Sequence, residues 1–164
     1  MLPPWAQVSA ERRAHIERVA GLLGAWADAM GVTEIERARW LKAAYLHDAL
    51  RDAPLADHLA HGPAAAERAA REGETDQGVL DAVRYHTVGY AGWDDVGRML
   101  YLGDFLEPGR RFAVDERRAL ALRVPQQRDA VLKEVVRWRI DWVLRSGWPL
   151  APETVALWNA LASR

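Results

Sequence analysis

Apolar side chains recur at helical spacing along almost the whole chain. The first stretch has one apolar face, formed by His15, Val19, Leu22, Trp26 and Met30. Ser9 precedes this stretch and Gly31 follows it, which predicts a helix that ends near residue 30. Alternation with a period of two, the mark of a strand, never persists beyond about five residues. The pattern predicts an all-α fold.

Capping residues and helix breakers divide the rest of the chain into further helices. Thr33 and Glu36 form a T-x-x-E capping box, which predicts a second helix ending near Leu50. A Gly-Pro pair predicts the start of a third helix just after His61. The remaining helices are predicted at about 75–86, 94–104, 114–123, 127–146 and 153–163. With about seven or eight helices and no linker, residues 1–164 are expected to form a single domain.

Composition narrows the class of protein. The chain has 164 residues, of which 50% are hydrophobic and 27% charged, as in an ordinary globular domain. Its net charge of −1 gives no reason to expect binding to nucleic acid or to a membrane surface. The absence of cysteine excludes disulfides, zinc-thiolate sites and cysteine nucleophiles. No secretory signal and no apolar stretch of about 18–20 residues is present, so we expect a cytoplasmic protein.

Several ionisable residues lie on the inward faces of the predicted helices. They are His15, His47, Asp48, His86 and Asp104. A single histidine on an apolar face is usually a hydrogen-bonded core residue, but an unpaired buried carboxylate is strongly unfavourable. No inward-facing lysine is apparent, and any arginine would have to come from elsewhere in the chain. A metal ion neutralises the carboxylates directly, and imidazole with carboxylate suits iron, manganese, cobalt or zinc.

Six segments resemble, in the same order, those of the HD-domain metal-dependent phosphohydrolases. They are RRAHIERV (12–19), AAYLHDALR (43–51), HGPAAA (61–66), RYHTVG (84–89), GDFLEPGR (103–110) and GWPLAPETVALWN (147–159). The YHTxG, EPGR and C-terminal P-x-T…N segments resemble the YqeK-type subfamily, bacterial enzymes that hydrolyse diadenosine tetraphosphate symmetrically to two ADP. The resemblance implies a helical bundle with a metal site in its core. Residues 12–110 would carry the motifs, and helices within 114–163 would complete the nucleotide site.

The resemblance implies a centre of two metal ions, and iron is the metal usual in this subfamily. One ion would be held by His15, His47, Asp48 and Asp104, and the other by His61 and His86, with Asp48 bridging. His61 is implied by the resemblance alone. Its place at a helix N-terminus fits a ligand, because that position disfavours a protonated imidazole. His58 matches no position of the family and is expected to be a loop histidine.

Other residues are expected to contact the substrate. Arg51 stands one helical turn after His47, so it is expected to act in catalysis with Asp48 by pairing with a phosphate oxygen. The resemblance places the phosphates against His86, Thr87, Gly89, Asp104 and Arg110, and the nucleoside against Gly147, Pro149 and Pro152. Six arginines and two acids give residues 110–128 a local charge of +4. Most of these arginines are expected to be solvated, with Arg110 as the exception. Phe105 stands where the family commonly has lysine.

The expected function is hydrolysis of diadenosine tetraphosphate to two ADP by a water that the metal ions acidify. An HD-type nucleotidase acting on a nucleoside monophosphate or another nucleotide is the alternative enzyme. A nucleotide-binding sensor without turnover is the non-enzymatic alternative, and oxygen activation by two iron ions is a third. One apolar face near the C-terminus fits either the core or a homodimer surface; it is formed by Leu132, Val136, Ile140 and Val143.

Overall fold

The computed structural model describes residues 1–163, and within them the chain forms seven α-helices and no strand. In chain order these are α1 (Ala10–Met30), α2 (Glu34–His47), α3 (His61–Arg71), α4 (Gln77–Tyr85), α5 (Asp95–Leu106), α6 (Val114–Arg145) and α7 (Pro152–Ala162). The predicted all-α fold is confirmed. Among the described helices, none is long and apolar enough to cross a membrane.

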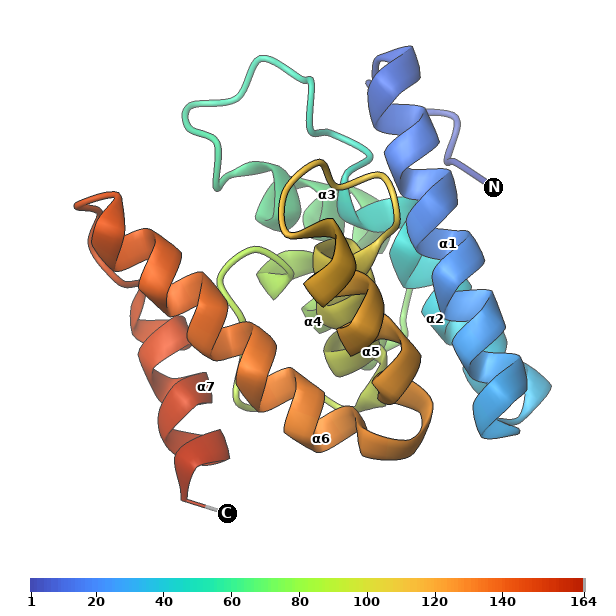
Figure 1. Cartoon of the computed structure of the whole chain (residues 1–164). Coiled ribbons are helices and arrows are strands. Elements are labelled where there is room, and N and C mark those ends of the chain that lie inside the picture. Colours follow the sequence, from blue (N-terminus) through green and yellow to red (C-terminus); the bar gives the residue numbers. More distant parts are fainter. Residues whose placement is uncertain (164) are drawn as a thin grey trace.

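Helix α5 occupies the middle of the bundle (Figure 1). It packs against α1, α2, α4 and α6, and its Met99, Leu100 and Leu102 are completely buried. Helices α1 and α2 form one antiparallel pair, and α6 and α7 form another pair at the opposite side of the molecule (Figure 1). The ends of α1, α2, α3, α4 and α5 therefore meet around one buried region, which α6 and α7 flank.

Helix ends are set largely by the capping residues that the sequence predicts. Ser9 Oγ accepts a hydrogen bond from the Arg12 amide at 3.2 Å, and Thr33 Oγ1 accepts one from the Glu36 amide at 3.2 Å. In a full capping box, the Glu36 carboxylate would also accept a hydrogen bond from the Thr33 amide. Here it accepts hydrogen bonds from the side chains of Trp40 and Arg39 instead. Glu36 thus binds side chains of α2 and not the backbone amide at the start of the helix.

Arg39 connects α2 to two other helices. Its guanidinium pairs with Asp76 at 2.6 Å and with Asp94 at 2.7 Å. These aspartates are the N-caps of α4 and α5, where their carboxylates also accept hydrogen bonds from backbone amides. One arginine therefore sets the starting points of the two helices that deliver His86 and Asp104.

Two predicted helix boundaries are displaced, and a third, within α6, is a kink. Helix α2 ends at His47 instead of near Leu50, because Asp48 leaves the helical conformation at φ −107° and ψ 13°. Helix α3 begins at His61 itself. The two helices predicted over 114–123 and 127–146 follow one another within α6, where they are separated by a kink two residues after Pro125, at Gln127, whose φ of −136° and ψ of 36° are not helical. Proline removes a backbone donor and crowds the preceding turn, which explains the kink.

The structure shows which residues of two predicted apolar faces are buried. On α1, Leu23 is completely buried, whereas Leu22 is only partly buried. On α6, Leu132 and Val136 lie in the core and Ile140 packs against it, so most of this face is used within the chain. A homodimer stays a prediction.

The start of α3 lies unusually close to the end of α4. A Cβ atom on Gly62 would lie 2.9 Å from the carbonyl oxygens of both Val83 and Arg84. Real side chains do not tolerate this approach to backbone atoms, so only glycine allows the two helix ends to meet here. This contact brings His61 of α3 to His86, which directly follows α4.

We expect Gly62→Ala and Gly21→Ala to change stability in opposite directions. The first introduces a backbone clash, which lowers the free energy of unfolding by about 1–3 kcal/mol. The second adds a methyl group to the interior of α1, where nothing lies within 4 Å, and raises that free energy by about 0.5–1 kcal/mol. Urea unfolding followed by circular dichroism measures both. Equal effects of the two substitutions would contradict the close approach of α3 and α4.

Candidate metal centre

Most of the buried polar side chains of the chain gather at one place between the helix ends. They are His15, His47, Asp48, His61, His86 and Glu107, each at most 5% exposed. The side chain of Asp104 lies beside them at 14% exposure. All six residues that the sequence predicts as metal ligands therefore belong to one cluster.

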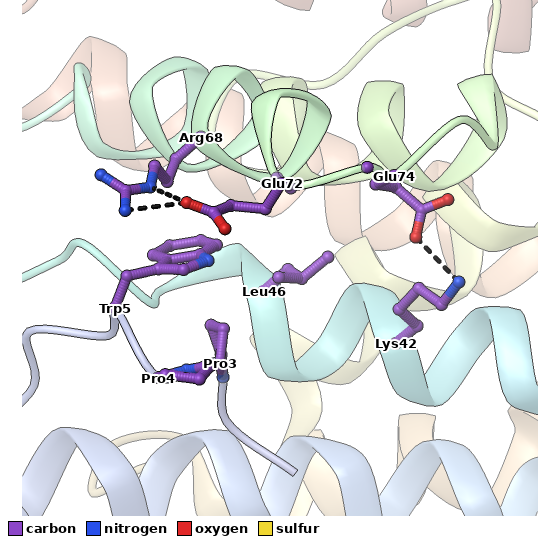
Figure 2. Close-up of a pocket in the computed structure, with 10 residues that line it drawn as sticks. Pro3, Pro4, Trp5, Lys42, Leu46, Arg68, Glu72 and Glu74 are labelled. Carbon is purple, nitrogen blue, oxygen red and sulfur yellow. Dashed lines mark hydrogen bonds and ion pairs between the residues drawn. The ribbon is translucent and has the colours of Figure 1, made fainter.

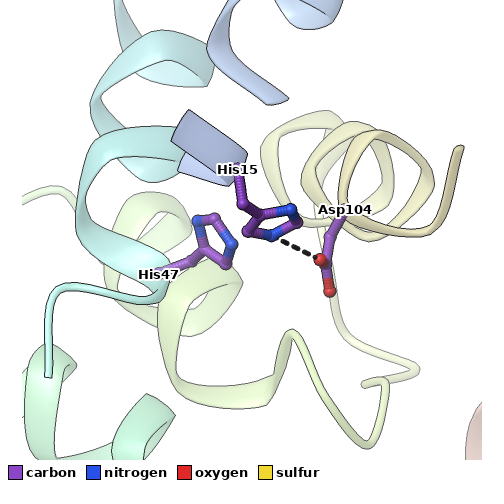
Figure 3. A group of neighbouring side chains, drawn as sticks. All are labelled: His15, His47 and Asp104. Atoms are coloured by element: carbon purple, nitrogen blue, oxygen red, sulfur yellow. Dashed lines mark ion pairs between the residues drawn. The ribbon is translucent and has the colours of Figure 1, made fainter. Parts of the chain in front are cut away.

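The cluster divides into two groups of three. His15 of α1, His47 of α2 and Asp104 of α5 form the first group (Figure 3). Asp48, His61 and His86 form the second. Within each group the nitrogen and oxygen atoms offered as ligands lie within 4.8 Å of one another.

Asp48 lies between the two groups and faces both. Its Oδ1 is 3.1 Å from His61 Nε2 and 3.4 Å from His86 Nε2. Its Oδ2 is 3.7 Å from the Nε2 atoms of both His15 and His47. The end of α2 makes this possible, because the turn after His47 directs the next side chain back into the cluster.

The four histidines are oriented in the same way. Each Nδ1 donates its proton to an oxygen on the outside of the cluster: Glu107 Oε1 for His15, and backbone carbonyls of Ala44, His58 and Val83 for the others. These donor–acceptor distances lie between 2.6 and 3.1 Å. In a neutral imidazole with its proton on Nδ1, the lone pair of Nε2 is free, so each of these rings in its neutral form presents a lone pair to the two aspartates.

This arrangement fits metal ions. Within residues 1–163, the buried Nε2 atoms of His15 and His47 have no hydrogen-bond partner. The Nε2 atoms of His61 and His86 lie 3.0 Å apart, a distance at which two lone pairs repel unless a cation or proton separates them. Two carboxylates and four imidazole nitrogens match the ligand preferences of iron, manganese, cobalt and zinc.

The charges in the cluster and its burial shift the pKa values of the ligand side chains in different directions. Burial opposes the charged form of His15, but the neighbouring carboxylates of Asp104 and Glu107 outweigh it and raise the pKa of His15 to about 9. Complete burial lowers the pKa of His47 to about 4. Although burial of Asp48 favours its neutral form, the surrounding histidines hold its pKa well below the usual range. The carboxylates are therefore ionised and ready to bind a cation.

Arginines from distant parts of the chain also neutralise the cluster. Arg12 Nη1 lies 2.7 Å from Asp48 Oδ2, and Arg110 Nη2 lies 2.7 Å from Asp104 Oδ1. Sequence analysis did not identify Arg12, although it lies one turn before His15 on α1 and inside the quoted segment RRAHIERV. Helical spacing places Arg12 near the same face as His15, and that signal could have identified it.

Glu107 is the main residue that sequence analysis missed. It is 2% exposed, and its carboxylate is held by His15 Nδ1, Arg18 Nε at 2.6 Å and the Gly109 amide at 2.6 Å. Burial opposes ionisation, but the hydrogen bonds from His15 and Arg18 lower the pKa of Glu107 to about 2. It lies in the quoted EPGR segment just after α5, where helical periodicity no longer predicts which way a side chain faces.

The residues predicted to contact phosphate lie around the cluster to different extents. Thr87 Oγ1 is 3.2 Å from His86 Nε2, at the inner edge of the centre. Gly89 has a φ of 88°, and a Cβ atom there would lie 2.6 Å from Leu157 of α7. The Arg110 guanidinium donates to the Asp104 carbonyl as well as to its carboxylate. Arg51 lies in the turn after α2, where its amide donates to the Asp48 carbonyl.

The segment predicted to contact the nucleoside lies between α6 and α7. Gly147 and Pro149 flank Trp148 in the sequence, and Pro152 begins α7. The ring of Trp148 lies 6.0 Å from the ring of His58. His58 is an exposed loop residue, as predicted, and its carbonyl holds Nδ1 of His61. This contact brings the turn between α6 and α7 next to the loop that leads into the centre.

One of the arginines expected to be solvated is buried. Arg117 is 3% exposed, and its guanidinium lies between the rings of Phe105 and Phe112, 3.9 and 4.1 Å from their centroids. It donates hydrogen bonds to the carbonyl oxygens of these two phenylalanines. The expectation of a solvated side chain was wrong because aromatic faces and free carbonyls, rather than carboxylates, satisfy this cation.

A surface pocket lies outside the cluster (Figure 2). It is bounded by the N-terminal segment, α2 and α3, and its walls carry the ion pairs Arg68–Glu72 and Lys42–Glu74. None of the residues that line it belongs to the two ligand groups. The pocket and the ligand cluster are therefore separate places on the molecule.

Comparison with known proteins agrees with this geometry. The model of the HD domain family matches residues 12–132, a range that contains every residue of the two ligand groups. The chain belongs to the HD domain family. A crystal structure from Clostridium acetobutylicum, described as a predicted HD superfamily hydrolase involved in NAD metabolism, has the same fold. It superposes with a TM-score of 0.83 at 24% identity, covering 96% of this chain and 92% of that one.

Two curated relatives of this HD domain protein carry the same name, symmetrical bis(5'-nucleosyl)-tetraphosphatase. The protein from Bacillus subtilis is 34% identical over 116 residues, which is 68% of this chain and 61% of the relative. The protein from Halalkalibacterium halodurans is 31% identical over 109 residues, which is 64% of this chain and 56% of the relative. The match thus spans about three fifths of the length of these relatives.

We expect metal binding to this HD domain to release a proton and to strengthen as pH rises. In the metal-free protein His15 has a raised pKa of about 9, so it is protonated at neutral pH, whereas a ligating imidazole is neutral. Affinity for Mn²⁺ should therefore increase at least about tenfold per pH unit up to about pH 9. The ligand His86 adds to this dependence, because the effect of its burial is outweighed by hydrogen bonding to Asp48, which raises the pKa of His86. His47, with a pKa of about 4, contributes no proton in this range.

Calorimetric titration with Mn²⁺ at about pH 7 and about pH 8, in buffers of different ionisation enthalpy, measures both quantities. Glu107→Gln weakens the charge that raises the pKa of His15, so it should shift the pH dependence toward lower pH. An affinity that is identical at the two pH values would contradict the protonation of His15.

Proposed function

We propose that this protein is a metal-dependent phosphohydrolase that cleaves diadenosine tetraphosphate symmetrically to two ADP. The observation that carries the proposal is the Asp48 carboxylate, which lies between the inward-facing Nε2 atoms of four histidines. The names of the curated relatives support this choice of substrate.

The two groups of ligands define which residues would hold which ion. His15, His47 and Asp104 would hold one ion, His61 and His86 the other, and the two oxygens of Asp48 would face one ion each. When bound, two such ions, with iron as the first expectation, polarise a phosphate and acidify a water. Glu107 and the carbonyls at Nδ1 keep the four imidazole rings in the tautomer and orientation that ligation requires.

Cationic and hydroxyl side chains at the rim would bind the polyphosphate. Arg110 is held in place by the Asp104 carbonyl, and one third of its side chain is exposed to an incoming ligand. Thr87 places a hydroxyl beside His86. Arg51 follows Asp48 by three residues and would add a guanidinium that can bind phosphate through two hydrogen bonds. Gly147, Pro149 and Pro152 would contact the nucleoside together with Trp148.

The reaction needs no covalent intermediate with the protein. The oxygen of one water bonds to one of the two central phosphorus atoms. The bond from that phosphorus to the oxygen that bridges the central phosphates breaks, and the bridging oxygen leaves with the second ADP. One water is consumed, and the proton balance is completed by release to solvent.

A product assay on protein purified without chelator tests the proposal. We expect ADP as the sole product from diadenosine tetraphosphate, loss of activity on chelation and recovery on addition of Fe²⁺ or Mn²⁺. In ¹⁸O-labelled water, mass spectrometry should find the label in half of the ADP molecules. ATP and AMP as products would contradict symmetrical cleavage.

Other results of this assay would favour a different function. Release of nucleoside and phosphate from a nucleoside monophosphate, with no ADP from the dinucleotide, indicates an HD-type nucleotidase. Tight ADP binding by the metal-loaded protein without turnover indicates a sensor. Oxygen uptake by the protein loaded with ferrous iron, without hydrolysis, indicates oxygen activation.

We expect Asp48→Asn to lower both metal content and turnover, because it removes the charge shared by the two groups. Turnover should fall at least about a thousandfold, since catalysis by charge stabilisation at the phosphate depends on the ions. Asp141→Asn removes the same charge from the exposed surface of α6 and should leave both quantities unchanged. Metal analysis and kcat/KM measure the effects, and retained hydrolysis in Asp48→Asn would exclude a two-metal mechanism.

A further inference from the structure

Arg139 lies in the second half of α6 and reaches across to the segment that follows His86. Its Nη2 donates a hydrogen bond to the Thr87 carbonyl at 2.9 Å. Thr87 is the residue whose hydroxyl is 3.2 Å from His86 Nε2. Arg139 therefore contacts the residue next to His86, a ligand of the second group, although Arg139 and Thr87 are 52 positions apart in the sequence.

The segment after His86 is held from outside by both C-terminal helices. Thr154 of α7 donates to the Val88 carbonyl at 2.6 Å, next to the Thr87 carbonyl that Arg139 binds. Thr154 is 8% exposed, so this hydrogen bond is largely shielded from solvent. Because Thr154 supports this backbone as well, Arg139 is not alone in holding the segment in place.

The charge of Arg139 has no carboxylate partner among the described residues. Its only hydrogen bond there goes to the Thr87 carbonyl, and its guanidinium lies 5.4 Å from the ring of Tyr101 and 5.9 Å from that of Phe105. These aromatic faces stabilise a cation weakly and leave other N–H donors of the guanidinium unused. The side chain is only partly buried, so a ligand can approach it.

The guanidiniums of Arg117 and Arg139 lie 3.9 and 5.9 Å from the ring centroid of the same residue, Phe105. Phe105 directly follows Asp104, which Arg110 binds. Burial, together with the positive charges of Arg110 and Arg139, lowers the pKa of Arg117 to about 10. Of these three cations, only Arg110 is paired with a carboxylate. Like charges gathered at low solvent exposure are unfavourable unless an anion joins them. The ligand expected at such a place is an anion with several oxygens.

We propose that Arg139 binds a phosphate of the substrate. It would do so beside the second ligand group, whereas Arg110 lies beside the first. Arg110 is anchored to Asp104 of the first ligand group, and Arg139 is anchored to Thr87 beside the second group. The two guanidiniums would then bind different phosphates of one polyphosphate chain. This assignment rests on the proposed function for the identity of the substrate, but it requires only a ligand with two linked phosphates.

Binding of methylenediphosphonate to the Mn²⁺-loaded protein tests the proposal without turnover. This compound presents two linked phosphonates and is not hydrolysed. We expect Arg139→Gln to weaken its binding roughly ten- to hundredfold in calorimetry, because a charge-assisted hydrogen bond is lost. Thr154 still holds this segment through the Val88 carbonyl, so metal content should not change. Arg139→Lys keeps the charge but lacks the planar guanidinium. Its affinity for methylenediphosphonate should lie between those of the unmodified protein and Arg139→Gln.

Arg137→Gln is the matched control. It removes the same charge two residues away on α6, where the side chain is exposed to solvent, so binding should stay within about twofold of the unmodified protein. Thermal unfolding verifies that each variant is folded, and if Arg139→Gln is not, Arg139→Lys provides the comparison. Diphosphonate binding that is unchanged in both Arg139 variants would overturn the proposal. Loss of bound Mn²⁺ in Arg139→Gln would also overturn it, because Arg139 would then act by positioning His86.

Kinetics with diadenosine tetraphosphate separates this proposal from the proposed function. If the unmodified protein hydrolyses the dinucleotide, Arg139→Gln should raise KM more than it lowers kcat. If the unmodified protein does not hydrolyse it, the proposed function fails. A weakened binding of methylenediphosphonate by Arg139→Gln would still support Arg139 as a phosphate-binding residue.

Discussion

A buried carboxylate stays ionised only where positive charge or hydrogen-bond donors surround it, and Asp48 is the residue on which this constraint acts most strongly. Four histidines and Arg12 surround it, and no other residue of the centre faces both ligand groups. The helix ends of the bundle converge on this carboxylate. The end of α2 at His47, the start of α3 at His61 and the end of α4 before His86 all deliver side chains to it.

The cluster depends as much on its outer contacts as on the ligands themselves. Each imidazole is fixed by an acceptor at Nδ1, and Glu107 provides that acceptor for His15 while it also binds Arg18 and the Gly109 amide. The C-terminal helices support the opposite side, where Arg139 and Thr154 hold the backbone after His86. Helices α6 and α7 therefore contribute to the centre although they supply no metal ligand.

Much of the site could be predicted from the sequence because most of its ligands lie on helices. His15, His47 and Asp104 recur at helical spacing with buried apolar residues, so their inward orientation follows from periodicity alone. His61 needed the resemblance to a family, because a histidine at a Gly-Pro helix start has no apolar face to mark it. Glu107 escaped prediction for a related reason, since it follows α5 in a segment without a repeating pattern.

The amino-acid sequence by itself determined the helices, most of their caps and, apart from His61, the inward-facing histidines and aspartates, since these depend on residues within one or two turns of each other. Tertiary structure alone decided which cation neutralises which carboxylate. Arg12 meets Asp48, Arg117 enters an aromatic sandwich and Arg139 reaches Thr87 only after distant helices have packed. Because an arginine side chain is long and flexible, its partner depends on which helices pack beside it. A local sequence pattern cannot predict that partner.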